Sequence, residues 1–169
     1  MLFGAGWCVL RSSRDAYATA TVDELGTLDP LTKRNDEKLF ADFREWMASH
    51  DSPWLLWTLH EQHNNHEGFL QFFISRNHRA SPVWDMLQWI ASNGPSSYGL
   101  FYVHDDEDVV DHSSHGRGIT EDFDNVFRVH RIQRGVVTEH ADPFFGPIVP
   151  SIDCIHPYDR EGDEFDCDS

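Results

Sequence analysis

The sequence predicts an α+β fold in which two main helices pack on one face of an antiparallel or mixed β-sheet. Apolar patterns follow one another in the order strand, helix, strand, strand, helix, strand, strand. Apolar residues make up 40% of the chain, which is enough to fill one core. A length of 169 residues suits a single domain. We expect this domain to span residues 1–153 and to be followed by an acidic, irregular and flexible tail over residues 154–169.

The first strand is predicted close to the N-terminus. Apolar residues at every second position are separated by smaller residues, which is typical of a half-buried strand. These positions are Phe3, Ala5, Trp7 and Val9. The following segment, Ala16–Arg34, carries Gly26 and Pro30, and both residues disfavour a regular helix. We therefore expect a loop or short turns there.

Helical spacing of apolar residues predicts two helices. The first is capped by Asn35 or Asp36 and runs to about His50. The second begins at Ser81-Pro82 and ends at Gly94-Pro95. The apolar stripes are Leu39, Phe43, Trp46 and Met47 in the first helix and Val83, Met86, Leu87 and Ile90 in the second. Four tryptophans are also expected in the core or between helix and sheet, namely Trp54, Trp57, Trp84 and Trp89.

Runs of aromatic and branched residues predict the remaining strands. Two strands form a long hairpin with a polar tip at Glu61–Glu67, another ends near His104, and the last two form a closing hairpin around Arg134-Gly135. The ranges are Trp54–His60, Phe69–Arg76, Tyr98–Val103, Val126–Gln133 and Val136–Glu139. The prolines after Asp142 exclude a helix or an interior strand there. The order of the strands within the sheet does not follow from the sequence.

The charge of the chain narrows the classes of partner. Lys and Arg number 13 against 29 Asp and Glu, so the formal net charge is −16. A surface this acidic repels phosphates and anionic lipids, which disfavours binding to nucleic acids or membranes. No apolar run approaches the ~20 residues of a membrane span and no signal peptide is visible, so we expect a cytoplasmic protein. Cys8, Cys154 and Cys167 are too few for a disulfide framework and are expected to be reduced.

A run of four acidic residues stands where the predicted strand Tyr98–Val103 ends. The run comprises Asp105, Asp106, Glu107 and Asp108. The sheet would hold these carboxylates toward solvent, and such a strand end is most often a solvated or partner-binding surface. Hard cations also bind clustered carboxylates, but the alternating acids and central glycine of an EF-hand are missing, so we expect no metal. The further acidic stretch Asp111–Asp124 is expected to form a mobile loop.

Histidines and cysteines offer little catalytic chemistry. His60, His63 and His66 recur at every third residue of the predicted hairpin, and His78 follows it. Residues three apart in an extended strand point to opposite faces, so these side chains do not converge on a zinc ion. No cysteine lies in a nucleophile turn, and no phosphate-binding loop is present. The sequence therefore predicts neither a cofactor nor an enzyme.

Phe144 and Phe145 lie among prolines and near acidic residues. Aromatic side chains beside carboxylates can form a contact surface for a cationic protein. Anchoring of the C-terminal segment to the core is the equal alternative. Together with the acidic run, these two phenylalanines are the candidate partner-binding residues.

Five separated stretches follow one another in a characteristic order. They are Gly6-Trp7, Asn77-His78-Arg79, Ser97–Asp108, Phe127–Gly135 and Asp142–Pro150, the last followed by Ile152-Asp153. Together they resemble the immunity protein 7 family of bacterial polymorphic toxin systems over about Phe3–Asp153. The loop Asp111–Asp124 looks longer than the family's usual connection, and the tail after Asp153 looks additional, so nothing carries over to either segment.

The resemblance implies a cytoplasmic antidote that binds and neutralises a cognate toxin. It brings no catalytic residues, and the family's acidic run corresponds here to Asp105–Asp108. A toxin that acts on nucleic acid, such as a nuclease, needs a basic surface, onto which an acidic partner would be steered. Two other functions stay open, an acidic adaptor for a different protein and a metal hydrolase that uses Asp105, Asp106 and Asp108. The oligomeric state also stays open.

Overall fold

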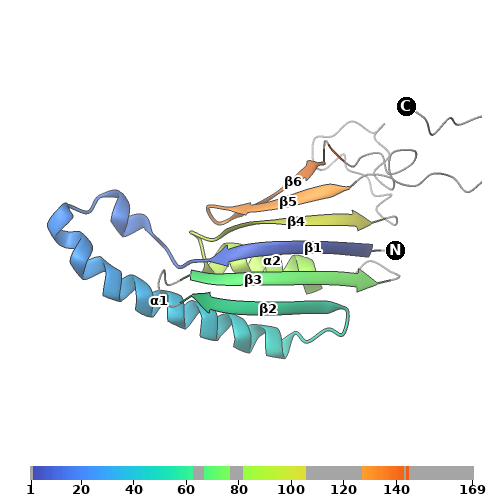
Figure 1. Cartoon of the computed structure of the whole chain (residues 1–169), viewed down its shortest axis with the longest axis horizontal. Helices are drawn as coiled ribbons and strands as arrows, with labels where there is room; N and C mark the ends of the chain where they lie inside the picture. Colours follow the sequence, from blue (N-terminus) through green and yellow to red (C-terminus); the bar gives the residue numbers. More distant parts are fainter. Residues whose placement is uncertain (1, 63–66, 77–81, 106–126, 143, 145–169) are drawn as a thin grey trace, which may run out of the picture.

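The computed structural model describes residues 2–62, 67–76, 82–105, 127–142 and 144. Within these ranges, six strands form one antiparallel sheet in the order β2-β3-β1-β4-β5-β6, accompanied by two main helices (Figure 1). The elements are β1 Leu2–Leu10, the 3-10 helix η1 Asp15–Ala18, α1 Val22–Ser49, β2 Leu55–Gln62, β3 Glu67–Arg76, α2 Pro82–Asn93, β4 Tyr98–Asp105, β5 Arg128–Gln133 and β6 Val136–Ala141. The predicted α+β class is confirmed. The predicted loop Asp111–Asp124 and the predicted tail lie outside the described residues.

The N-terminal strand lies in the middle of the sheet. β1 pairs antiparallel with β3 on one side and β4 on the other, so that Gly6 stands between Phe72 and Phe101. Both predicted hairpins, β2–β3 and β5–β6, are present. The turn between β5 and β6 has positive φ at Arg134 (53°) and Gly135 (71°), as tight hairpin turns require.

Both helices pack on the same face of the sheet, which we call the covered face. Phe43 of α1 meets Trp57 of β2 and Trp89 of α2, with both pairs of ring centroids 5.5 Å apart. Trp84 of α2 meets Phe101 of β4 at 5.5 Å. Burying one such side chain fully contributes roughly 1.5–3 kcal/mol. The predicted stripes provide the helical part of this core, with Leu39, Phe43 and Met47 buried in α1 and Val83, Met86, Leu87 and Ile90 buried in α2.

Glycines in β1 make room for rings from the neighbouring strands. A Cβ atom at Gly6 would lie 2.4 Å from the Phe72 ring, and one at Gly4 would lie 2.7 Å from the Phe101 ring. The two rings therefore pack over the backbone of β1 on the covered face. Leu2, Cys8 and Leu10 are buried on the same face. The apolar positions predicted from the sequence, Phe3, Ala5, Trp7 and Val9, lie on the opposite face, where Ala5 and Trp7 are exposed.

The first helix begins much earlier than the sequence predicts. α1 starts at Val22 and includes both Gly26 and Pro30, so the expectation of a loop over Ala16–Arg34 is wrong. At its start the Glu24 carboxylate accepts hydrogen bonds from the Thr21 backbone N–H and hydroxyl, both at 2.8 Å. Pro30 removes one backbone donor, but Gly26, four residues earlier, is exposed, so water can reach its carbonyl. The capped first turn and the hydrogen bonds of the rest of the helix therefore stabilise α1 by more than the one hydrogen bond lost at Pro30.

One tryptophan departs from the prediction. Trp57, Trp84 and Trp89 pack against the core as expected. Trp54 does not, because it is 49% exposed, and the next residue, Leu55, is the one that turns toward the helices. Trp54, which directly precedes β2, therefore lies on the side of the sheet opposite the helices.

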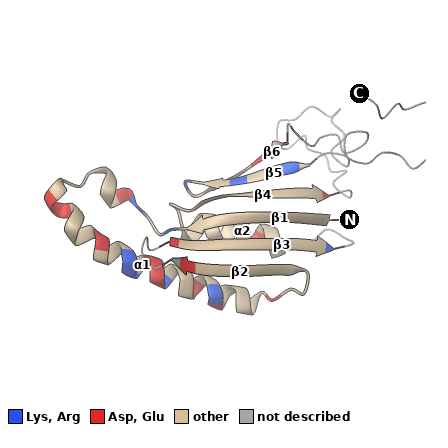
Figure 2. Cartoon of the chain, viewed as in Figure 1, with Lys and Arg blue, Asp and Glu red and all other residues tan. Residues whose placement is uncertain are grey.

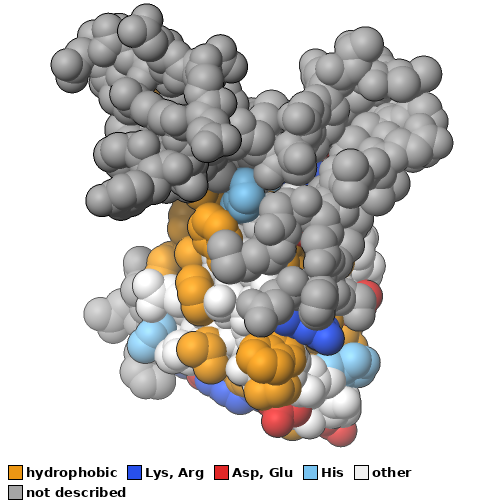
Figure 3. Space-filling model, turned by 90° about the vertical axis from the view of Figure 1, so that its right-hand side faces the viewer, with side chains coloured by type: hydrophobic (Ala, Val, Ile, Leu, Met, Phe, Trp, Pro, Cys, Tyr) orange, Lys and Arg blue, Asp and Glu red, His pale blue; other side chains and the backbone are white. Residues whose placement is uncertain are grey.

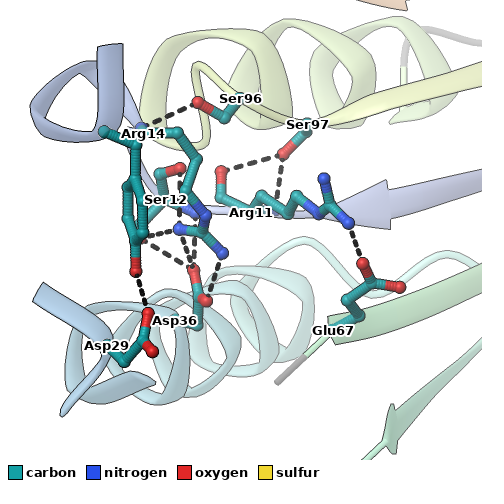
Figure 4. A network of polar contacts seen from close by, with 9 residues as sticks. Arg11, Ser12, Arg14, Asp29, Asp36, Glu67, Ser96 and Ser97 are labelled. Carbon is teal, nitrogen blue, oxygen red and sulfur yellow. Dashed lines mark hydrogen bonds and ion pairs between the residues drawn. The ribbon is translucent and has the colours of Figure 1, made fainter. Parts of the chain in front are cut away.

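A buried ion pair fastens α1 to the chain that leaves β1 (Figure 4). Asp36 is fully buried, and Arg14 donates to its two carboxylate oxygens at 3.1 and 2.6 Å. The backbone N–H and hydroxyl of Ser12 add hydrogen bonds of 2.8 and 2.7 Å. Asp36 was expected as a possible helix cap, which is wrong, because the helix already runs through it. Ser96 and Ser97, before β4, bind the backbone N–H groups of Arg14 and Arg11, both at 2.9 Å.

Candidate protein-binding surfaces

The acidic run was expected to point toward solvent from the end of β4. Asp105 is instead fully buried. It follows Phe101 and Val103 at alternate positions of β4, so it belongs to the covered face, and it pairs in register with Leu2 of β1. The other members of the run, Asp106, Glu107 and Asp108, lie outside the described residues. The prediction that Asp105 faces solvent is therefore wrong, because the alternation along β4 turns its side chain toward the helices.

Polar side chains gather beside Asp105 at this end of the covered face. Arg128 of β5 is almost fully buried and donates to the Glu139 carboxylate of β6 at 2.9 Å. His130, two residues further along β5, and Asp142, directly after β6, are also buried, and none of these side chains is free. The Asp142 backbone N–H donates to the Phe127 carbonyl at 2.9 Å and so closes the β5–β6 hairpin. This end of the covered face therefore carries buried polar side chains next to the apolar core.

Of the two candidate phenylalanines, the structure describes one. Phe144 is 80% exposed, so anchoring to the core does not describe it. Phe145 lies outside the described residues. An exposed aromatic ring beside a sheet end is available to a partner. Seen from the end of the sheet at which β1 starts and β4 ends, hydrophobic side chains reach the surface at several further places (Figure 3).

The described part of the chain shows neither a cluster of metal ligands nor a reactive cysteine. No group of three or more His, Cys, Asp or Glu residues there could hold a metal ion. His60 is exposed on β2, whereas His63, His66 and His78 lie outside the described residues. Burial raises the pKa of the Cys8 thiol to about 12, so this cysteine stays protonated at neutral pH.

One extended apolar surface does not follow from the sequence. The face of the sheet opposite the helices, which we call the open face, exposes aromatic and aliphatic side chains. The exposed members are Leu56 of β2, Phe73 of β3, Trp7 of β1, Tyr98 and Tyr102 of β4, and Val136 of β6. The sequence does contain an indication of this surface. Large apolar residues occupy both odd and even positions of the same strands, which is typical of a sheet with two apolar faces.

Charge is distributed unevenly between the sheet and the first helix. Acidic and basic residues follow α1 along its length, whereas most of the sheet carries neither (Figure 2). Among the described residues, Glu67 is the one acidic side chain that the alternation places on the open face, and it pairs with Arg11.

The family model of immunity protein 7 matches residues 1–153. The chain belongs to the immunity protein 7 family. Its class is therefore that of immunity proteins of toxin systems, whose partners are their cognate toxins. Searches of curated proteins and of solved structures found no match. In the described residues, no helix is both long enough and apolar enough to cross a membrane.

Proposed function

We propose that this immunity protein neutralises one cognate toxin by stoichiometric masking, and that the toxin is a cationic protein such as a nuclease. Membership of the immunity protein 7 family is the observation that carries the first part. The net charge of −16 supports the second part, because an acidic protein attracts a basic one and raises its association rate.

Two sets of residues named from the sequence are proposed to contribute to binding. Asp106, Glu107 and Asp108 supply negative charge directly after β4. Phe144 supplies an exposed ring, and Phe145 is its neighbour in sequence. Asp105 leaves this set, because its burial suits a role in holding the end of β4 rather than in touching a partner.

Inhibition is proposed to need one chain per toxin and no turnover. Specific complexes of this kind bury on the order of 1,200–2,000 Å² of total surface. Co-expression with the toxin encoded beside this chain should restore growth, and the two proteins should co-purify at equal amounts. Titration of purified toxin activity should end at one chain per toxin. An end point far below one chain per toxin would contradict masking, since a bound inhibitor cannot act catalytically.

The acidic run can be tested by its effect on association. Replacing Asp106, Glu107 and Asp108 by their amides should slow association and flatten its dependence on salt. The matched control removes three exposed charges from α1 in the triple variant Asp23→Asn, Glu37→Gln and Glu45→Gln, which changes the net charge equally. Stopped-flow mixing with the toxin between low and high salt measures both. Equal slopes for the two triple variants would remove the run from the steering surface.

A further inference from the structure

The open face has a continuous aromatic centre. Trp7 of β1 stacks on Phe69 of β3 with ring centroids 6.3 Å apart and meets Tyr98 of β4 edge to face at the same distance. The Arg11 guanidinium lies over the Tyr98 ring, 5.3 Å from its centroid. Rings and guanidinium thus join three adjacent strands into one surface.

Ala5 stands in the middle of this surface. Its register partners are Phe73 on β3 and Tyr102 on β4, and all three residues are exposed. A small side chain between two exposed rings leaves the centre of the face accessible. It also offers a position where a larger side chain can be added without removing any packing.

The composition of the open face is that of a binding surface. Tryptophan, tyrosine and arginine are the residues most enriched at binding hot spots, whereas acids are depleted from interface cores. The face carries Trp7, Tyr98, Tyr102 and two arginines, Arg11 and Arg131. Its single acid among the described residues, Glu67, is neutralised by Arg11, so docking would bury no unpaired carboxylate there.

The face is also large enough. Six strands spaced ~4.8 Å apart, with a rise of ~3.3 Å per residue, cover on the order of 700 Å². A standard interface buries about 800 Å² on each partner. The open face alone therefore provides most of the area that a specific complex needs.

The net charge of the chain distinguishes between two possible partners for the open face, a second copy of this chain and a cationic protein. A second copy of this chain would bring a net charge of −16 against −16, which opposes self-association. A cationic protein is attracted by the same net charge. Its contact patch must be flat and apolar to match the rings, and it must offer a carboxylate or carbonyl oxygen to Arg131.

We propose that the open face is the docking surface for such a cationic protein, which, resting on the proposed function, is the cognate toxin. Acidic segments elsewhere accelerate the encounter, and the open face holds the complex.

The test compares two identical substitutions in the full chain. Ala5→Arg places a long charged side chain at the centre of the open face, and Ala48→Arg places the same side chain on the exposed side of α1. Affinity for the toxin encoded beside this chain is measured by calorimetry, at low salt and again at about 0.5 M salt. Ala5→Arg should weaken binding at least about 100-fold at both salt concentrations, and Ala48→Arg should change it less than about 3-fold. Thermal melts confirm that both variants fold, and Tyr102→Ala replaces Ala5→Arg should that variant unfold.

The outcomes separate the docking surface from the proposed function. Unchanged affinity in Ala5→Arg and Tyr102→Ala, with a wild-type protein that binds and rescues growth, would overturn the docking surface and leave the function standing. A wild-type protein that neither binds nor rescues would overturn both. A wild-type dimer, seen by light scattering and split by Ala5→Arg, would make a second copy the occupant and also overturn the proposal.

Discussion

The two faces of the sheet use similar side chains for different purposes. Phe101 and Tyr102 are neighbours on β4, yet Phe101 is fully buried beneath α2 and Tyr102 is 36% exposed on the open face. On the covered face an aromatic ring stabilises the fold by leaving water. On the open face a ring remains partly in water and gains its full burial only when a partner binds. Hydrophobicity alone therefore does not distinguish core from binding surface, but the position of the helices does.

Alanine substitutions at these two neighbouring residues of β4 test the contrast directly. Phe101→Ala should lower the free energy of unfolding by roughly 3–5 kcal/mol, because it removes a ring packed between Phe72 and Trp84. Tyr102→Ala should cost about 1 kcal/mol or less, since much of its ring is already solvated. Urea denaturation of both variants measures the difference. Equal losses would mean that the open face is as much a part of the core as the covered face.

The next effect concerns the ion pair at the edge of the covered face. Asp36→Ala should destabilise the fold by about 3 kcal/mol, because Arg14 and Ser12 lose the buried acceptor that they share. Asp42→Ala is the control, since Asp42 pairs with Lys38 on the exposed side of α1 and such pairs are worth about 0.5 kcal/mol or less. Guanidinium denaturation gives both values. A loss at Asp36 no larger than that at Asp42 would show that the network does not fasten α1 to β1.

Substitutions at a packed glycine and at a solvated glycine should change stability in opposite directions. Gly6→Ala should cost roughly 1–3 kcal/mol, because the new Cβ would lie 2.4 Å from the Phe72 ring on the covered face. Gly26→Ala should stabilise by roughly 0.5–1 kcal/mol, since a Cβ there meets nothing within 4 Å and alanine favours a helix. Melting temperatures should therefore move in opposite directions. A stabilising Gly6→Ala would mean that the Phe72 ring can move aside without loss.

The sequence predicts the parts of this fold that depend on local patterns. α2, both hairpins and the end of β4 near His104 follow from periodicity and turn residues. The sheet order does not, because β1 pairs with β3 and β4, about 70 and 100 residues away in the chain. Nor does the inward side of β1 follow, because it is set by rings that neighbouring strands place over Gly4 and Gly6.

Local rules also failed where distant residues supply the stabilisation. Asp36 resembles a helix cap in sequence, but Arg14 makes it a buried anion within a longer helix. Asp105 resembles the first member of a solvated run, but alternation along β4 turns it inward. The candidate binding surface was overlooked for a related reason, since Trp7 and Tyr102 resemble core residues until the helices are placed on the other side.

A still smaller effect is expected at the start of α1, where residues 22–35 contain no buried side chain and the helix projects past the end of the sheet (Figure 1). Hydrogen bonds from the Thr21 backbone N–H and hydroxyl lower the pKa of Glu24 below its ordinary value of 4.5. Because the folded pKa is lowered, the stabilisation is fully present above about pH 4.5 and is lost as the pH falls through the folded pKa. Glu24→Gln should therefore be slightly less stable than wild type at pH 7 and equal to it at acid pH.

Melting curves of wild type and Glu24→Gln between pH 7 and pH 3 measure this convergence, and Glu37→Gln, an exposed acid in the same helix, serves as the control. The difference is small because Glu24 is fully solvated and the capped segment packs on neither face. A gap between wild type and Glu24→Gln that stays constant down to pH 3 would show that the carboxylate's charge is not what caps the helix. The early start of α1 would then depend on the chain leaving η1 and not on its own first turn.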